Sequence, residues 1–170
     1  MENHKQWYKA ETKDKQDIAD FLVSMNNQTQ SPLTSLPGGI EGLLNLAEKN
    51  GGFLYTKEDN KIIGISQYTY GEPSKNYKNK EIGYLYLTVI NPNNRRDGRR
   101  SLNLFKKYIE VFEESNSEKI KWKSYKENNQ YVNRLYSKFA TITKESINTQ
   151  NIVSYEWTTT VDKLKNKFRL

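Results

Sequence analysis

Cysteine is absent from this sequence of 170 residues, and histidine occurs once, at position 4. The lack of thiols excludes disulfides, thiolate-ligated zinc, iron–sulfur clusters and a cysteine nucleophile. A single histidine beside the N-terminus argues against a His-rich metal site and against a Ser–His–Asp triad. We therefore expect no metal, and any catalysis would depend on Tyr, Glu, Asp, Lys or backbone groups.

Long apolar runs are also missing. No stretch approaches the roughly 18 consecutive apolar residues of a membrane span, and residues 1–6 are too polar for a signal peptide. We expect a cytoplasmic protein without a membrane partner. The length favours a single domain covering residues 1–170. The 12 Tyr, 6 Phe and 3 Trp supply enough aromatic surface to argue against disorder.

Basic residues are in excess, with 27 Lys+Arg against 20 Asp+Glu and a net charge of +7. Much of this charge is local. Residues 95–107 hold four Arg and two Lys against one acid, Asp97, which gives 6 − 1 = +5. Such a cluster indicates an anionic partner, and the candidates range from nucleic acid to a nucleotide cofactor.

Hydrophobic periodicity predicts a mixed α+β domain. The run 82–90 is apolar almost throughout, so we expect it to be a central strand. A polar turn at 57–60 predicts a hairpin, and Asn50-Gly51-Gly52 predicts a helix end. The expected strands are 7–11, 53–56, 62–70, 82–90, 120–124, 140–146 and 152–161; the expected helices are 14–25, from 38 to about 50, 98–115, and from 128 or 129 to 139.

The junction at 82–112 carries the most functional information. A buried strand ends at Pro92, a basic loop follows, and a helix begins at Gly98. The start of a helix presents free backbone N–H groups and the positive end of the helix dipole, which suit phosphate. Gly98 would allow a ligand to approach the backbone closely.

This junction resembles the acyl-CoA signature of the GCN5-related N-acetyltransferase (GNAT) family, in which Arg/Gln-x-x-Gly-x-Gly/Ala follows an apolar strand and a Pro. Arg95 and Gly98 match, and Pro92 stands three residues before Arg95. Arg100 stands where Gly or Ala is usual, and its long side chain would either reach solvent or contact a phosphate of CoA.

A second segment, 129–139, resembles the family's Asn-x-x-Ala-x-x-Leu-Tyr-x-Lys helix. Val132 replaces the usual Ala, and the Gly-Phe that often follows is missing. The two motifs occur in the family's order and spacing, and the resemblance covers about residues 7–160. It implies the GNAT fold: an α+β domain with a mixed, mostly antiparallel central sheet flanked by helices, in which a splayed strand pair binds acyl-CoA.

The resemblance also implies a ligand and the residues that would hold it. Acetyl-CoA would be the co-substrate, with its pantetheine arm along Thr88, Val89 and Ile90 and also in contact with Asn129. Its pyrophosphate would bind N–H groups of Arg95, Arg96, Asp97, Gly98, Arg99, Arg100 and Ser101.

The expected reaction moves an acetyl group from acetyl-CoA to a primary amine by direct attack. By resemblance, Tyr136 would protonate the leaving thiolate. A backbone N–H near Val89 or Ile90 would polarise the thioester carbonyl. Glu81 or Glu72 would accept a proton from the amine, with water alone as the third option.

Two other functions remain open at this stage. One is a GNAT-like protein that binds acyl-CoA without catalysis. The other is a basic nucleic-acid-binding module, although no nucleic-acid motif is recognisable and we expect no such partner. The identity of the amine acceptor and a homodimeric state are both left open.

Overall fold

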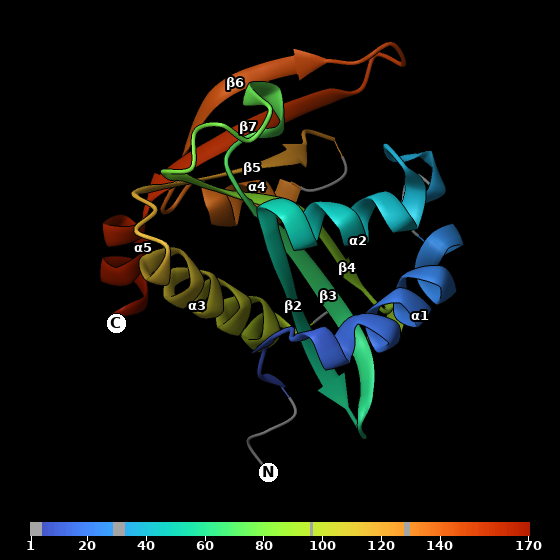
Figure 1. Cartoon of the computed structure of the whole chain (residues 1–170). Helices are drawn as coiled ribbons and strands as arrows, with labels where there is room; N and C mark the ends of the chain where they lie inside the picture. The colour runs from blue at the N-terminus through green and yellow to red at the C-terminus, as the bar shows by residue number, and fades with distance from the viewer. Residues whose placement is uncertain (1–4, 29–32, 96, 128–129) are drawn as a thin grey trace. The chain divides into compact units, whose positions relative to one another are not determined.

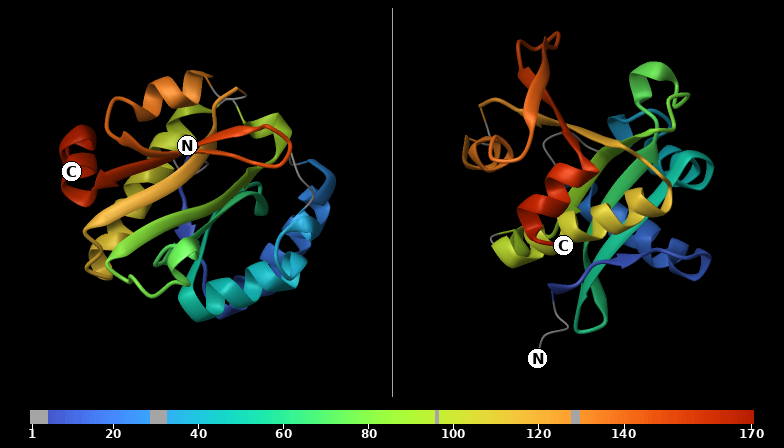
Figure 2. Two further views of the ribbon diagram at one scale, coloured as in Figure 1. Left: turned by 90° about the horizontal axis from the view of Figure 1, so that it is seen from above. Right: turned by 90° about the vertical axis from the view of Figure 1, so that its left-hand side faces the viewer.

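A computed structural model describes residues 5–28, 33–95, 97–127 and 130–170 (Figures 1 and 2). The chain divides into two compact units, Met1–Thr69 with Leu87–Lys107 and Tyr70–Tyr86 with Tyr108–Leu170. Strand β4 (Ile82–Ile90) and helix α3 (Gly98–Glu114) each have residues in both units. The expectation of one domain over 1–170 stays a prediction.

The strands of the described chain form one sheet in the order β1-β2-β3-β4-β5-β7-β6, so β4 is central as expected. Of the pairings with a known register, only β4 with β5 is parallel, and the others are antiparallel. This confirms the α+β class with a mixed, mostly antiparallel sheet. The other strands are β1 (Tyr8–Lys9), β2 (Gly51–Glu58), β3 (Lys61–Tyr70), β5 (Lys119–Tyr125), β6 (Thr141–Ile147) and β7 (Val153–Thr160).

In the first unit, α1 (Lys15–Met25) and α2 (Gly39–Asn50) contact each other, and α2 contacts β2 (Figures 1 and 2). Helix α1 buries Ile18, Phe21, Leu22 and Met25, the helical stripe expected from the sequence. Helix α2 ends where Gly51 begins β2. A Cβ on Gly51 would lie 1.9 Å from the carbonyl oxygen of Tyr68, so glycine is required there by close strand approach.

In the second unit, α3 packs its Phe112 ring against β4 at Gly83, where a Cβ would lie 2.4 Å from the ring. Tyr108 and Phe112 stack along α3 with ring centroids 5.8 Å apart. The other helices of this unit are α4 (Gln130–Tyr136) and α5 (Val161–Phe168).

Two expectations about elements were wrong. The hairpin turn is only Asp59–Asn60, because Lys57 and Glu58 pair with Ile62 and Lys61 and extend the strands. The last strand does not end the fold, because Thr160 accepts a hydrogen bond from the Lys163 N–H and starts α5. Short 3₁₀ turns, not predicted as elements, are Thr12–Asp14, Asn26–Gln28, Leu33–Ser35, Pro73–Lys75 and Pro92–Asn94.

None of the helices in the described ranges has the length and apolar character needed to cross a bilayer.

Candidate active site

Hydrogen bonds hold the described part of the loop after β4 against the end of that strand. Thr88 is exposed, Val89 is buried and Ile90 is half-buried. Arg95 is exposed, but its guanidinium is engaged by main-chain carbonyls. Its Nε donates to the Ile90 carbonyl at 3.1 Å and its Nη2 to the Gln28 carbonyl at 2.9 Å. The arginine of the motif therefore ties the loop to the end of β4 and to the turn after α1.

Asp97 caps the start of α3. Its Oδ1 accepts from the N–H groups of Arg99 at 3.1 Å and Arg100 at 3.3 Å, while Lys5 Nζ lies 3.1 Å from Oδ2. Burial works to raise the pKa of Asp97, but the hydrogen bonds from Lys5 and from the Arg100 N–H hold it below its usual value. Two of the N–H groups that the motif assigns to pyrophosphate thus already donate to a carboxylate.

Arg100 takes neither of the two orientations expected for its side chain. The residue is 3% exposed, and its Nη2 lies 3.5 Å from Glu58 and 3.9 Å from Asp97. The indole N–H of Trp7 donates to its carbonyl at 2.9 Å. The guanidinium is therefore buried against Glu58 and Asp97 at the start of α3, and the side chain does not extend toward the open surface at Gly98.

Gly98, the glycine of the motif, faces open space, because a Cβ built on it meets no heavy atom within 4 Å. Arg99 is exposed and Ser101 is half-buried. The surface at the start of α3 is thus accessible to a ligand. Arg96 and Asn129, both expected to bind the cofactor, lie outside the described residues.

Tyr136 ends α4 inside an aromatic cluster. Its ring centroid is 5.1 Å from that of Trp122, 5.7 Å from that of Trp157 and 6.1 Å from that of Phe139. Burial raises the pKa of Tyr136 to about 12, so the phenol keeps its proton at neutral pH but is a weaker acid than an exposed tyrosine. The same contacts also make Tyr136 part of the packing of the second unit.

The two carboxylates expected near the amine differ in environment. Glu81 is exposed at the start of β4. Glu72 is 5% exposed; Lys121 Nζ donates to its Oε1 at 2.8 Å and Asn79 Nδ2 donates to its Oε2. Burial works to raise the pKa of Glu72, but the Lys121 and Asn79 hydrogen bonds outweigh it and lower that pKa. A carboxylate so stabilised is a weak base.

Sequence reasoning counted Tyr84 among the strand tyrosines that could line an acceptor pocket, but it missed Lys121, which binds Glu72, and Glu156, which lies beside Lys121. Lys121 Nζ lies 3.7 Å from Glu156 Oε1, and Lys121 pairs directly with Tyr84 across β4 and β5. One signal was available. If Tyr155 and Trp157 share one face of a strand, Glu156 must lie on the other face. The partner of Glu156 could not be found in this way.

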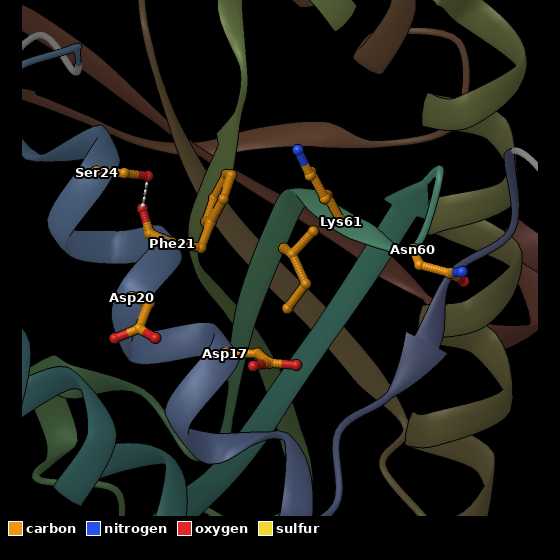
Figure 3. A pocket seen from close by; sticks show the side chains of 7 residues that line it. Asp17, Asp20, Phe21, Ser24, Asn60 and Lys61 are labelled. Carbon is orange, nitrogen blue, oxygen red and sulfur yellow. Dashed lines mark hydrogen bonds between the residues drawn. The ribbon is translucent and has the colours of Figure 1, made fainter.

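A hollow of about 340 Å³ lies in the first unit (Figure 3). Ser24 Oγ donates to the Phe21 carbonyl on one side of it at 2.7 Å. None of the residues expected to bind acetyl-CoA lines it. Its walls are Asp17, Asp20, Phe21 and Ser24 of α1, and Asn60, Lys61 and Ile62 at the β2–β3 turn.

A metal site is not indicated within the described part of the chain, where no three His, Asp or Glu side chains come together.

No family model matches the sequence, and no curated protein matches it. Solved structures do match. An acetyltransferase of the GNAT family from Streptococcus pneumoniae has a TM-score of 0.65 and 22% identity, over 91% of this chain and 97% of that chain.

The chain has the GNAT fold. The ribosomal-protein-S18-alanine N-acetyltransferase from Escherichia coli matches with a TM-score of 0.66 at 9% identity, over 92% of this chain and 93% of that chain. The yncA protein from Salmonella typhimurium, solved with its cofactor acetyl-CoA, matches with a TM-score of 0.69 at 11% identity, over 92% and 94% of the two chains. In this fold the junction of β4, loop and α3 is the one that resembles the acyl-CoA signature.

Proposed function

We propose that this protein is an acetyl-CoA-dependent N-acetyltransferase that transfers the acetyl group directly to a primary amine. The observation that carries the proposal is the junction of β4 and α3. On a GNAT fold it combines the motif residues Arg95 and Gly98 with an open helix start and a local charge of +5 over residues 95–107.

The cofactor would be held mainly by main-chain groups. Its pyrophosphate would accept hydrogen bonds from the N–H groups of residues 95–101, where the helix dipole also favours an anion. Asp97 must then share or release the N–H groups of Arg99 and Arg100. The pantetheine arm would run along Thr88, Val89 and Ile90, the end of β4, and would also contact Asn129.

The chemistry needs a neutral amine, because an ammonium of pKa about 10 has no lone pair. The amine nitrogen attacks the thioester carbon, the C–S bond breaks, and the thiolate leaves. We assign protonation of that thiolate to Tyr136. A backbone N–H near Val89 or Ile90 would stabilise the developing oxyanion. Glu81, Glu72 or water would take the amine proton, and the weak basicity of Glu72 disfavours it among the three.

Thermal-shift measurements test whether the protein binds acetyl-CoA. Acetyl-CoA should raise the Tm, whereas an RNA homopolymer at about 150 mM salt should not, because phosphate contacts without specificity weaken with salt. A Tm that responds to RNA and not to any acyl-CoA would replace this proposal with the nucleic-acid module.

The substitution Gly98→Trp tests whether the cofactor pyrophosphate binds at Gly98. The new side chain enters open space, so the Tm of the free protein should stay unchanged while the indole fills the phosphate seat and abolishes the acetyl-CoA shift. Gly98→Ala is the matched control and should keep the shift. If the Trp variant binds acetyl-CoA as tightly as the original protein, the pyrophosphate does not lie at Gly98.

Release of CoA thiol in the presence of a panel of amines tests the transfer itself. Turnover with any amine supports the enzyme. Binding of acetyl-CoA with no release across aliphatic, aromatic and peptide amines would leave the non-catalytic acyl-CoA-binding protein as the better reading.

A further inference from the structure

One face of β4, β5 and β7 in the second unit carries a cluster of polar side chains. Tyr84 on β4 pairs with Lys121 on β5, and Glu156 on β7 pairs with Lys123, two residues further along β5. Directly paired residues share a face, and so do residues two apart on a strand. Tyr84, Lys121 and Glu156 therefore lie on the same face, with Glu72 from the loop after β3 upon it.

Within this cluster Glu72 is already satisfied. Lys121 occupies one of its oxygens and Asn79 the other, and the Glu72 N–H donates to Asn79 Oδ1 at 2.9 Å. These bonds fix the loop after β3 to the sheet. Glu72 has a structural task that leaves little capacity for a ligand.

Glu156 is in the opposite situation. Its side chain is only 13% exposed, and its nearest cation, Lys121 Nζ, is 3.7 Å away, beyond hydrogen-bonding distance. Among the described residues no donor makes a hydrogen bond to its carboxylate. Lys123 on β5 and Lys144 on β6 pair with it across the strands but form no ion pair with it there. A half-buried carboxylate that lies beside one lysine and accepts no hydrogen bond from the described chain keeps lone pairs open to the donors of a ligand.

The hydroxyl of Tyr84, on the same face of the sheet as Glu156, is also open to a ligand. The residue is 5% exposed, and its hydroxyl has no hydrogen-bond partner within the described part of the chain. Burial, and then the charges of Glu156 and Glu72, raise the pKa of Tyr84. The phenol therefore stays neutral, and its oxygen can accept a hydrogen bond from a ligand.

We propose that Glu156 and the Tyr84 hydroxyl receive the ammonium group of the acceptor, so that the substrate is an aliphatic primary amine, cationic at neutral pH. An ammonium offers three N–H donors, which suit one carboxylate and one phenolic oxygen. An aromatic amine or an alcohol is neutral and would gain little from the carboxylate. This inference rests on the proposed acetyltransfer and names its second substrate.

The placement also fits the course of the reaction. One ammonium proton passes to water, the neutral nitrogen bonds to the acetyl carbon, and the C–S bond breaks. A second proton leaves the nitrogen after the attack, and it balances the proton that Tyr136 gives to the thiolate. Tyr136 packs against Trp122 of β5 and Trp157 of β7. Trp122 follows Lys121 and Trp157 follows Glu156, so both tryptophans lie on the face opposite to the polar cluster. Amine and acid would therefore act from opposite faces.

Steady-state kinetics with n-butylamine, aniline and 1-butanol as probes test this assignment. The original protein should acetylate n-butylamine in preference to the two neutral probes. Glu156→Gln should raise KM for n-butylamine at least about tenfold, since a hydrogen bond to a charged group is lost, with the Kd of acetyl-CoA unchanged. Tyr84→Phe should raise that KM by a smaller factor and keep the ring.

Glu145→Gln is the matched control. Glu145 is exposed on β6 and pairs with Tyr155, on the face opposite to Glu156. The substitution therefore removes the same charge without touching the cluster, and it should leave KM unchanged. An unaltered KM in both Glu156→Gln and Tyr84→Phe, or a preference for aniline, overturns the inference while acetyltransfer stands. Failure of the original protein to bind acetyl-CoA overturns the proposed function instead.

Discussion

At the scale of single residues, Arg100 shows how far a motif can be read. The sequence places a long cation where the GNAT signature has Gly or Ala, and this suggests a phosphate ligand or a solvated side chain. The structure buries the guanidinium against Glu58 and Asp97. Glu58 is 42 positions away and its approach follows from the β2–β3 hairpin, so the motif alone could not predict this pairing.

Tyr136 gives the first residue-scale prediction. Tyr136→Phe should lower kcat on the order of 100-fold, the usual contribution of a general acid. It should leave the Kd of acetyl-CoA unchanged, since the ring contacts with Trp122 and Trp157 remain. Steady-state kinetics with n-butylamine, together with calorimetric titration of acetyl-CoA, measure the two effects separately.

Arg134→Gln is a suitable control for that experiment, because Arg134 is exposed on the same helix. An unchanged kcat in Tyr136→Phe would remove the phenol from the mechanism and leave it a purely packing role in the aromatic cluster.

At the scale of elements, periodicity predicted most of the fold. The continuous apolar run 82–90 identified the central strand, and the stripe from Leu102 to Phe112 identified α3. Helix α5 was missed, and its first residue, Val161, was assigned to the end of the strand expected at 152–161. The Thr160 cap that starts it, and the burial of Val161 and Leu164, are visible only with the sheet in place.

The contact between α3 and β4 supports a prediction at this scale. Gly83→Ala should destabilise the protein by about 1–3 kcal/mol, as overpacking usually does, because the new Cβ would lie 2.4 Å from the Phe112 ring. Urea unfolding gives the free energy of unfolding. Gly98→Ala adds the same methyl group in open space and should be neutral or slightly stabilising. Equal stability of the two variants would show that α3 yields easily at this contact.

At the scale of the whole molecule, the net charge of +7 turned out to be a weak guide. The basic segment 95–107 was evident from sequence, but the structure engages Arg95 with main-chain carbonyls and Arg100 with acids. Sequence reasoning named Glu72 and Tyr84 separately but could not group them with Lys121 and Glu156, since these residues come from β4, β5, β7 and a loop. Patterns along the chain therefore predicted elements, and only tertiary structure showed which charges remain available to a ligand.

Alkaline stability is a prediction for the molecule as a whole. Burial raises the pKa of Tyr84 and of Tyr136, the latter to about 12, while unfolded tyrosines ionise near pH 10. Above about pH 10 the unfolded state therefore binds fewer protons than the folded state, so the free energy of unfolding falls as pH rises. Each phenol contributes a slope of at most about 1.4 kcal/mol per pH unit.

Urea unfolding from about pH 8 to about pH 11 should show a fall in the free energy of unfolding that is confined to the upper part of that range. The double variant Tyr84→Phe/Tyr136→Phe should lose less, and an identical slope in the variant would mean that other groups control alkaline unfolding.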